Sequence, residues 1–475
     1  MTSPRPALLT VLGAGPAGYP AAFRAADLGL PVTLIDSAPA LGGTCLHRGC
    51  IPSKALLHAA RLLADAREAA AIGLEFAPPA IRLEKLREWK QSVTDRLAQG
   101  LVQLAKSRGV HVVEARAAFA APARLRLTAP DGSAQPLDFD TLLLATGSVP
   151  AMPAAFPANH PQVLDSTAAL ELAEIPESLL VVGGGYIGLE LGSVYAALGT
   201  RVTVVEMTGG LLPGVDRDLI VPLAKRLRGL FQAIHLNTRV AGVADDPAGL
   251  RVTLENTKTG ETREEIFAKV LVAVGRRPFT DGLELDQAGL ALTDRGFVAV
   301  DETGRTANPR VWAAGDVAGN PMLAHKATHE AVALVDRLLG REARLSAHIP
   351  AVVFTDPEIA WVGLTEAQAA EKGIAAKVSK FPWAASGRAL TLERGDGVTK
   401  ILADPASGKL LGAAIVGPGA GDLISEATLA LETGATVADL AHVIHPHPTL
   451  AETLGEAAEL HSGLCTHLFR PHKPT

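Results

Sequence analysis

Two copies of one short pattern constrain the fold of this chain more than any other feature. The first copy begins with an apolar run at residues 8–12, which is typical of a buried strand. The glycine-rich segment Gly13-Ala14-Gly15-Pro16-Ala17-Gly18 follows, then an alanine-rich stretch, and then a second apolar run at 32–35 that ends at Asp36. This order of strand, glycine turn, helix and strand predicts a βαβ unit.

The second copy repeats the same order later in the chain. An apolar run at 179–182 precedes Gly183-Gly184-Gly185-Tyr186-Ile187-Gly188, and a run at 202–205 ends at Glu206. In both copies the acidic residue stands 18 positions after the last glycine. A single glycine turn is common in ordinary α/β units, but two copies with matched spacing predict two dinucleotide sites.

Each part of the pattern has a physical task. The first glycine allows a tight turn, the second lets the backbone approach a pyrophosphate, and the third lets the helix pack closely on the strand. Free N–H groups at the helix N-terminus then hold the phosphates, and the acid accepts hydrogen bonds from a ribose. The predicted contacts are Gly13, Gly15, Gly18 and Asp36 in the first copy, and Gly183, Gly185, Gly188 and Glu206 in the second.

Glu206 also indicates which nicotinamide dinucleotide the second copy binds. Its carboxylate would repel the 2′-phosphate of NADP, and Met207 and Thr208 provide no guanidinium to receive that phosphate. We therefore expect NAD at the second copy. The residues alone do not say which copy holds a flavin.

The close pair Cys45 and Cys50 needs an explanation because the chain has only three cysteines. Its spacing differs from the C-x2-C of zinc ribbons and thioredoxins. Pro52 fits the first turn of a helix, where the helix dipole favours thiolates. Two incidental thiols and a redox pair are both compatible with this spacing, although a disulfide in a reducing compartment is more often catalytic than structural.

Composition narrows the class of protein. The 475 residues carry 44 Lys and Arg against 50 Asp and Glu, so no basic excess indicates nucleic acid or a membrane surface as a partner. The longest charge-free stretch, 141–164, holds four prolines and cannot be a continuous membrane-spanning helix. Three cysteines are too few for the disulfide framework of a small secreted protein or for a zinc ion bound by four thiolates. We expect a cytoplasmic protein without a metal site.

Two histidines near the C-terminal end, His445 and His447, precede the segment Thr449–Glu452. This segment fits a capping box, in which Glu452 reaches back to the N–H of Thr449. Alternatively, Glu452 orients a histidine that acts as a general base, as a carboxylate does in a catalytic triad. The residues alone decide neither between the two roles nor between the two histidines.

The cysteine segment carries a family resemblance. Residues 42–54, Gly-Gly-Thr-Cys-Leu-His-Arg-Gly-Cys-Ile-Pro-Ser-Lys, resemble the redox-active disulfide motif of the pyridine nucleotide–disulfide oxidoreductases. The resemblance covers nearly the whole chain and is strongest to the members that oxidise dihydrolipoamide. The further matching segments are 13–18, 145–148, 183–188 with Glu190, 275–278, 314–317, 323–327 and 445–452.

The resemblance implies an activity and its catalytic residues. Dihydrolipoamide would be oxidised to lipoamide through a Cys45–Cys50 disulfide and FAD, and hydride would pass to NAD. Cys50 would stand next to the flavin, and Cys45 would exchange with substrate. Lys54 would lie beside the flavin N5 edge and pair with Glu190.

The resemblance also implies a homodimer. The C-terminal domain would form its interface and bring His447, rather than His445, into the other subunit's site as the general base, with Glu452 orienting it. The implied partners are lipoyl-bearing acyltransferases or carrier proteins of 2-oxo acid dehydrogenase or glycine cleavage complexes.

Further dinucleotide contacts follow from the same resemblance. The first glycine copy and Asp36 would hold FAD, and the second copy and Glu206 would hold NAD. The additional residues implied are Gly43, Thr44, Lys54, Ala117, Gly147, Asp316 and Ala324 for FAD, and Val240 and Gly275 for NAD.

The implied fold is α/β, with two Rossmann-like dinucleotide-binding domains and a C-terminal α+β dimerisation domain. A proline-rich run at 150–161 is typical of an interdomain linker. We expect the first part of the FAD-binding domain at 1–150, the NAD-binding domain at 151–277, the second part of the FAD-binding domain at 278–348 and the dimerisation domain at 349–475.

Three places depart from the family pattern. Ala115 and Ala117 stand where glycine is frequent, and Phe279 replaces a common Asn. His47 and Arg48 lie inside the disulfide loop, where they bear on its redox potential. None of these departures removes a catalytic group.

Other functions have distinguishing features. A reductase of glutathione or a related thiol would use NADPH, against which Glu206 argues. Mercuric reductase chemistry would need a vicinal cysteine pair that residues 470–475 lack, and a flavin transhydrogenase would not need both Cys45 and Cys50. A non-catalytic subunit of a multienzyme complex would fail a dihydrolipoamide assay.

Overall fold

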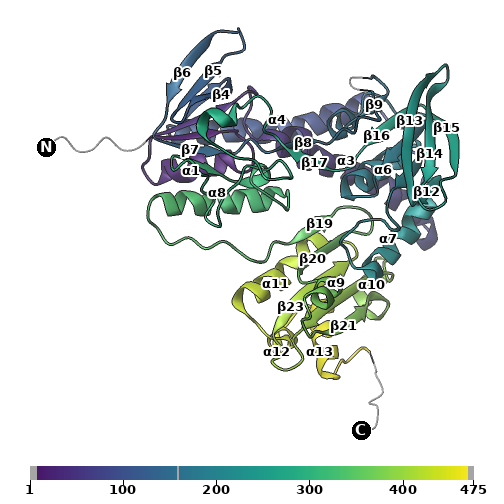
Figure 1. Ribbon diagram of the computed structural model, residues 1–475. Coiled ribbons are helices and arrows are strands. Elements are labelled where there is room, and N and C mark those ends of the chain that lie inside the picture. The colour runs from purple at the N-terminus through teal and green to yellow at the C-terminus, as the bar shows by residue number, and fades with distance from the viewer. Residues whose placement is uncertain (1–7, 158–159, 469–475) are drawn as a thin grey trace.

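The computed structural model describes residues 8–157 and 160–468. Figure 1 shows two parallel sheets side by side and, below them, a third sheet with the helices that end the described chain. The tail at 470–475, on which the exclusion of mercuric chemistry rested, lies outside the described residues.

The first parallel sheet has the strand order β18-β7-β1-β2-β3. Its central strand β1 is fully buried and pairs in parallel with β2 and β7. The strands are β1 (Leu9–Leu12), β2 (Val32–Asp36), β3 (His111–Glu114), β7 (Thr141–Leu144) and β18 (Val311–Ala313). Because β18 comes from much later in the chain, two separate sequence segments build this sheet.

Different elements cover the two faces of this sheet. On one face α1 (Gly18–Asp27) and α8 (Ala324–Leu338) pack against each other (Figure 1). An ion pair of 2.8 Å joins Arg24 of α1 to Asp336 of α8. On the other face Leu12 and Leu142 share a core with Phe119 of a small antiparallel sheet. The strands of that sheet are β4 (Arg116–Ala121), β5 (Arg124–Thr128) and β6 (Ala134–Asp138).

The second parallel sheet has the strand order β12-β11-β10-β16-β9, and the antiparallel strands β13, β14 and β15 accompany it. Its βαβ unit is β10-α6-β11, as β1-α1-β2 is in the first, so both predicted repeats are present. The elements are β9 (Val163–Leu164), α5 (Ser166–Glu171), β10 (Ser178–Val182), α6 (Tyr186–Leu198), β11 (Arg201–Glu206), α7 (Arg217–Leu230), β12 (Ala233–Leu236), β13 (Thr238–Asp246), β14 (Gly249–Asn256), β15 (Thr262–Phe267) and β16 (Lys269–Val272).

Two connections join the parallel sheets. The short strands β8 (Ser148–Pro150) and β17 (Arg276–Pro278) pair with each other. The long helix α3 packs on both α6 and α4. The helices in this region are α2 (Gly43–Arg48), α3 (Cys50–Glu68), η1 (Ala69–Ile72) and α4 (Leu83–Ser107), and η2 (Leu285–Ala288) and η3 (Gly315–Val317) flank β18 in the sequence.

The third sheet is antiparallel, with the order β19-β20-β23-β22-β21. Helices α11 and α13 pack on it, and Trp383 is fully buried in its core. The elements are β19 (Ala351–Val353), β20 (Ile359–Gly363), α9 (Glu366–Glu371), β21 (Lys377–Pro382), η4 (Trp383–Ala385), α10 (Gly387–Thr391), β22 (Val398–Ala403), β23 (Leu410–Val416), α11 (Ala420–Thr433), α12 (Val437–His442) and α13 (Glu452–Ser462). The fold class expected from the sequence is therefore confirmed.

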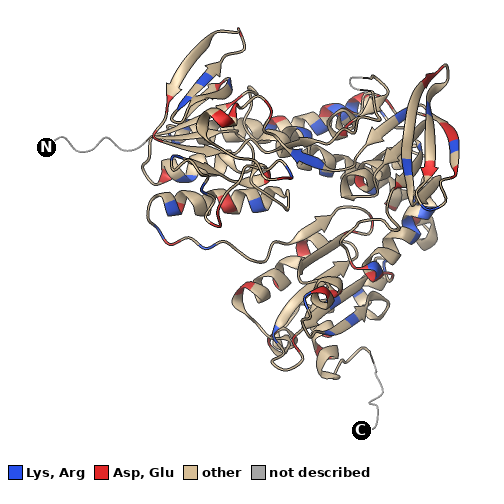
Figure 2. Ribbon diagram, viewed as in Figure 1, with Lys and Arg blue, Asp and Glu red and all other residues tan. Residues whose placement is uncertain are grey.

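Charged residues of both signs are interspersed along the elements (Figure 2). Within the described ranges, no helix is long and apolar enough to cross a membrane.

Candidate active site

A cavity of about 960 Å³ opens at the carboxyl ends of β1, β2 and β7. This is the edge of a parallel sheet at which nucleotides bind. Most residues expected to contact FAD or to carry the disulfide chemistry line its wall. They are Gly13, Gly15, Asp36, Gly43, Thr44, Cys45, Cys50, Lys54, Ala117, Gly147, Glu190, Asp316 and Ala324.

Backbone segments meet so closely at the first glycine turn that side chains cannot fit there. Gly13 has φ +102°, and a Cβ on it would lie 2.3 Å from the carbonyl oxygen of Ala145. A Cβ on Gly43 would lie 2.5 Å from the Cα of Gly15, and one on Gly18 would lie 1.6 Å from the carbonyl oxygen of Gly13. The turn is a tight backbone cradle at the mouth of the cavity, as a pyrophosphate site requires.

The acid that ends β2 orders the backbone around it. The two carboxylate oxygens of Asp36 accept the N–H of Ala14 at 2.6 Å and the N–H of Ala38 at 2.8 Å. Asp36 therefore joins the glycine turn to the segment that follows β2. The sequence pattern assigned Asp36 only to a ribose and did not predict these two bonds.

Glu206 repeats this arrangement in the second copy. Its carboxylate accepts the N–H of Gly184 and the N–H of Thr208, both at 2.7 Å. A Cβ on Gly183 would lie 2.5 Å from the carbonyl oxygen of Ala273, as one on Gly13 would from Ala145. The two predicted dinucleotide sites thus resemble each other in their backbone hydrogen bonds and close backbone contacts as well as in their sequence pattern.

The residues expected to contact NAD lie outside the wall of the large cavity, around the second glycine turn. Gly188 lies under Gly183, since a Cβ on it would be 2.3 Å from the Gly183 carbonyl oxygen. Around Gly185 and Gly275 a Cβ would meet nothing within 4 Å, so the backbone there is open to a ligand. Val240 is half-buried beside a β-bulge in β13.

Cys45 and Cys50 form a disulfide on the cavity wall. Cys45 lies in α2 and Cys50 begins α3, and their Cα atoms are 4.7 Å apart. Pro52 occupies the first turn of α3, as its position in the sequence predicted. The disulfide therefore faces the same cavity as the first glycine turn.

Lys54 and Glu190 form an ion pair on the wall of the same cavity. Lys54 Nζ is 2.9 Å from Glu190 Oε2, and the lysine also lines the cavity. Glu190 is 3% exposed, and its other oxygen accepts the N–H of Phe354 at 2.9 Å. The carboxylate is thus fully paired although it is buried.

A network that sequence reasoning missed surrounds Asp316. Ser148 Oγ donates to Asp316 Oδ2 at 2.5 Å, and Arg276 donates to the Oγ and to the carbonyl oxygen of Ser148 at 2.8 and 2.6 Å. All three residues line the cavity. Ser148, Arg276 and Asp316 lie in the family segments 145–148, 275–278 and 314–317. Membership of these segments was the only sign in the sequence that the three residues lie close together.

Glu452 serves both of the roles that the sequence left open. Its Oε1 lies 2.8 Å from His447 Nδ1, while its Oε2 accepts the N–H of Thr449 at 2.7 Å. Burial raises the pKa of this carboxyl, but the Thr449 and His447 hydrogen bonds outweigh it and lower the pKa overall. Glu452 therefore stays a carboxylate that can hold the imidazole.

The two histidines of this segment differ in their surroundings. The His447 side chain is 75% exposed, whereas that of His445 is 9% exposed and lies 2.9 Å from Glu426. His445 is thus packed within the third sheet's domain, and His447 is free to reach another molecule. Neither His447 nor Glu452 is among the described residues on the wall of the disulfide cavity of the same chain.

Cys465, the third cysteine of the chain, is half-buried beside a carboxylate. Its Sγ lies 2.9 Å from Glu456 Oε2, beyond the end of α13. Burial and the neighbouring carboxylate raise the pKa of this thiol to about 11. Cys465 is a free thiol, in contrast to the disulfide pair.

Comparisons with known proteins agree with this architecture. The sequence profile described as "Pyridine nucleotide-disulphide oxidoreductase" matches residues 8–331, and the dimerisation domain of the same family matches residues 349–458. A dihydrolipoyl dehydrogenase of Vibrio parahaemolyticus is 43% identical over 463 residues, which are 97% of each chain. A dihydrolipoyl dehydrogenase of Thermus scotoductus is 45% identical over 452 residues, which are 95% of this chain and 96% of that one.

Solved structures extend the similarity to three dimensions. LpdA from Mycobacterium tuberculosis superposes with a TM-score of 0.88 at 29% identity, over 96% of this chain and 99% of the other. The HOCl-induced flavoprotein disulfide reductase RclA from Escherichia coli has a TM-score of 0.85 at 28% identity, over 95% and 99%. The chain therefore belongs to the pyridine nucleotide-disulfide oxidoreductase family.

Proposed function

We propose that this protein is a dihydrolipoyl dehydrogenase, which oxidises dihydrolipoamide to lipoamide and reduces NAD. The observation that carries the proposal is the Cys45–Cys50 disulfide on the wall of the cavity that the first glycine turn enters. Relatives with that activity match nearly the entire chain. The disulfide is the electron acceptor that a dithiol substrate requires.

The cavity suits FAD. The glycine cradle of Gly13, Gly15 and Gly43 leaves room for a pyrophosphate, and Asp36 stands where a ribose would bind. Gly147, Asp316 and Ala324 line the same cavity farther along. FAD bound there would supply the chemistry that carries the electron pair of the reduced cysteines to NAD as hydride.

The protein's own residues carry out the thiol chemistry. Because Glu452 holds His447 at Nδ1, Nε2 is left as the base that removes a proton from one substrate thiol. The substrate thiolate attacks Cys45 Sγ, which forms a mixed disulfide and releases Cys50 as a thiolate. The second substrate thiol passes its proton to the Cys45 sulfur as it displaces that cysteine, so that lipoamide leaves and the electron pair remains on the two cysteines.

His447 acts in the site of a second copy of the chain under this proposal. Its 75% exposed side chain and its absence from the described wall of its own disulfide cavity support this placement. The matching dimerisation-domain profile supports a homodimer. We further propose the division 1–150, 151–277, 278–348 and 349–475, in which β18 returns to the first sheet.

The proposed protein partners of the enzyme follow from its proposed activity. Dihydrolipoamide is carried on proteins, so we propose lipoyl-bearing acyltransferases or carrier proteins of 2-oxo acid dehydrogenase or glycine cleavage complexes as partners. A cytoplasmic location, expected from the low cysteine content, stays a prediction.

An anaerobic titration tests the proposal. Dihydrolipoamide should reduce the FAD-loaded protein, and a long-wavelength absorbance band should then appear. NAD added next should restore the oxidised spectrum and yield NADH. Reduced glutathione with NADP serves as the matched control. Reduction by glutathione but not by dihydrolipoamide, or electron transfer only to NADP, would contradict the proposal.

A further inference from the structure

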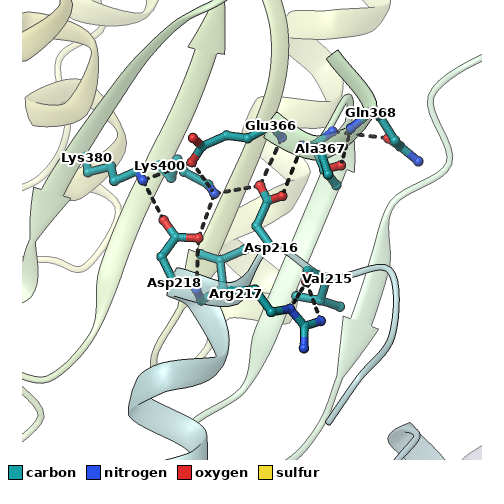
Figure 3. A network of polar contacts seen from close by, with 11 residues as sticks. Val215, Asp216, Arg217, Asp218, Glu366, Ala367, Gln368, Lys380 and Lys400 are labelled. Atoms are coloured by element: carbon teal, nitrogen blue, oxygen red, sulfur yellow. Dashed lines mark hydrogen bonds and ion pairs between the residues drawn. The ribbon is translucent and has the colours of Figure 1, made fainter. Parts of the chain in front are cut away.

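Lys400 is a fully buried lysine where the dimerisation domain contacts helix α7 of the part of the chain that contains the second parallel sheet. It lies in β22 with 0% exposure, and its Nζ contacts Asp216 Oδ2 at 2.6 Å, Asp218 Oδ1 at 2.9 Å and Glu366 Oε1 at 2.9 Å (Figure 3). Asp216 and Asp218 stand at the start of α7, whereas Glu366 begins α9. One ammonium group thus bridges elements from both parts of the chain.

The surroundings keep this lysine charged. Lys380 of β21 also contacts Asp218 at 2.8 Å and Glu366 at 2.9 Å, so two ammonium groups face three carboxylates (Figure 3). Burial acts to lower the pKa of Lys400, but the carboxylates outweigh it and raise the pKa. A buried charge of this kind is tolerated only while it is paired, so the junction has little freedom to shift.

Asp216 extends the junction into the backbone of both parts. Besides Lys400, it accepts the N–H of Glu366 at 3.0 Å and of Ala367 at 3.4 Å, which are the first two N–H groups of α9. It also stands directly before Arg217, the first residue of α7. The position of α7 is therefore tied to the dimerisation domain.

Arg217 continues the connection to the loop that follows Glu206. Its guanidinium donates to the carbonyl oxygens of Leu211, Leu212 and Val215 at 2.9, 2.8 and 2.6 Å. Leu212 has a positive φ of +49°, which is uncommon for a leucine, so the loop keeps this shape only because its contacts hold it.

The loop then returns to the glycine turn of the second repeat. The N–H of Leu212 donates to the carbonyl oxygen of Gly184 at 2.9 Å, and the N–H of Gly184 donates to Glu206 at 2.7 Å. A series of contacts thus runs from Lys400 to the acid that would bind the adenosine ribose of NAD. Its links are hydrogen bonds, except for the peptide bond between Asp216 and Arg217.

We propose that Lys400 of the dimerisation domain is a positioning residue for the adenosine half of the NAD site, acting through Asp216, Arg217 and the loop 207–215. This inference rests on the proposed function, because it assigns NAD to the second glycine turn. Lys400 lines neither the disulfide cavity nor the glycine turn, so it affects the reaction only through the loop.

The test is steady-state kinetics of the FAD-loaded dimer with Lys400→Met, which keeps the side chain's length and removes its charge. Because coupling between linked sites is roughly 5- to 150-fold, we expect the KM for NAD to rise about tenfold or more. The Ki of ADP-ribose, which is NAD without its nicotinamide, should rise in parallel. The rate of anaerobic reduction by dihydrolipoamide and kcat at saturating NAD should stay within about twofold.

Two further variants separate positioning from loss of stability. Thr399→Val is the matched control, since Thr399 is the buried neighbour in β22 that bonds to Trp383 and Thr453 instead of the carboxylates. It should leave the KM for NAD unchanged. The triple variant Lys400→Met, Asp218→Asn, Glu366→Gln removes the repulsion among the carboxylates and should form a stable dimer that still has the raised KM.

A soluble dimer of either Lys400 variant with a wild-type KM for NAD and a wild-type Ki for ADP-ribose would overturn the inference. So would an equal rise of the KM in Thr399→Val. Failure of the proposed function is recognised separately, because the wild-type protein would then not reduce NAD with dihydrolipoamide at all.

Discussion

Lys54 Nζ lies 2.9 Å from Glu190 Oε2, and this ion pair joins the helix that begins with Cys50 to the helix of the second glycine turn. The carboxylate is 3% exposed, whereas the lysine side chain is 33% exposed and lies 4.3 Å from the centre of the Phe354 ring. The disulfide helix α3 and the NAD-side helix α6 are thereby held together beside the cavity.

Lys54→Met should destabilise the protein, because it leaves Glu190 buried with only the Phe354 N–H as a partner. The expected loss in the free energy of unfolding is roughly 2 kcal/mol, the cost of an unsatisfied buried group. Urea unfolding monitored by flavin fluorescence measures it. The double variant Lys54→Met, Glu190→Gln should recover part of the loss; an unchanged midpoint in Lys54→Met would contradict the prediction.

Cys45→Ser should abolish dihydrolipoamide oxidation and leave FAD bound, because the substrate thiolate then has no disulfide to attack. Stopped-flow reduction and the flavin absorbance of the purified protein check both halves of this expectation. Cys465→Ser is the matched control, since Cys465 lies beyond α13 and not on the cavity wall. Turnover retained in Cys45→Ser would rule out the disulfide route.

The sequence allowed the prediction of features that local residue patterns determine. The glycine turns were predictable because a strand, a turn and a helix follow one another directly, and Pro52 marked the first turn of α3 for the same reason. The pairing of Cys45 with Cys50 and of Lys54 with Glu190 came from the family resemblance.

Contacts between residues far apart in the sequence could not be predicted. Ser148 and Asp316 are 168 positions apart in the sequence, and Lys400 and Asp216 are 184 positions apart. The local periodicity of the sequence does not predict such pairs. The two backbone bonds of Asp36 and of Glu206 depend on how the turn folds back after the strand. The contact of Cys465 with Glu456 likewise depends on how the chain turns back after α13 has ended.

His447→Ala should slow reduction by dihydrolipoamide by roughly 10²-fold, the usual contribution of a general base. His445→Ala should leave that rate within a few-fold and instead lower thermal stability, because His445 is packed against Glu426. Single-turnover reduction of the two variants, with thermal unfolding alongside, separates these outcomes. An equal loss of rate in both would show that His447 has no special role.

Glu206→Gln should reduce the preference for NAD over NADP by roughly tenfold or more, because a neutral amide no longer repels the 2′-phosphate. The amide keeps an oxygen that can accept one of the two backbone N–H groups, so the turn is disturbed less than by alanine. The ratio of kcat/KM for the two dinucleotides measures the preference. A ratio equal to that of the wild type would refute the repulsion argument.

Asp218 makes the junction around Lys400 sensitive to acid. Burial acts to raise the pKa of its carboxyl, but hydrogen bonds from Lys380 and Lys400 outweigh it and lower the pKa below the ordinary value. A group whose pKa is lowered by folding contributes stability above its unfolded-state pKa, about 3.9, and loses that contribution as the pH falls through the folded-state pKa. The wild type should therefore be more stable than Asp218→Asn by a constant amount at about pH 5 and above, and the difference should shrink below about pH 4. Urea midpoints of both proteins across this range provide the measurement, and a difference that stays constant down to about pH 3 would be inconsistent with a paired Asp218.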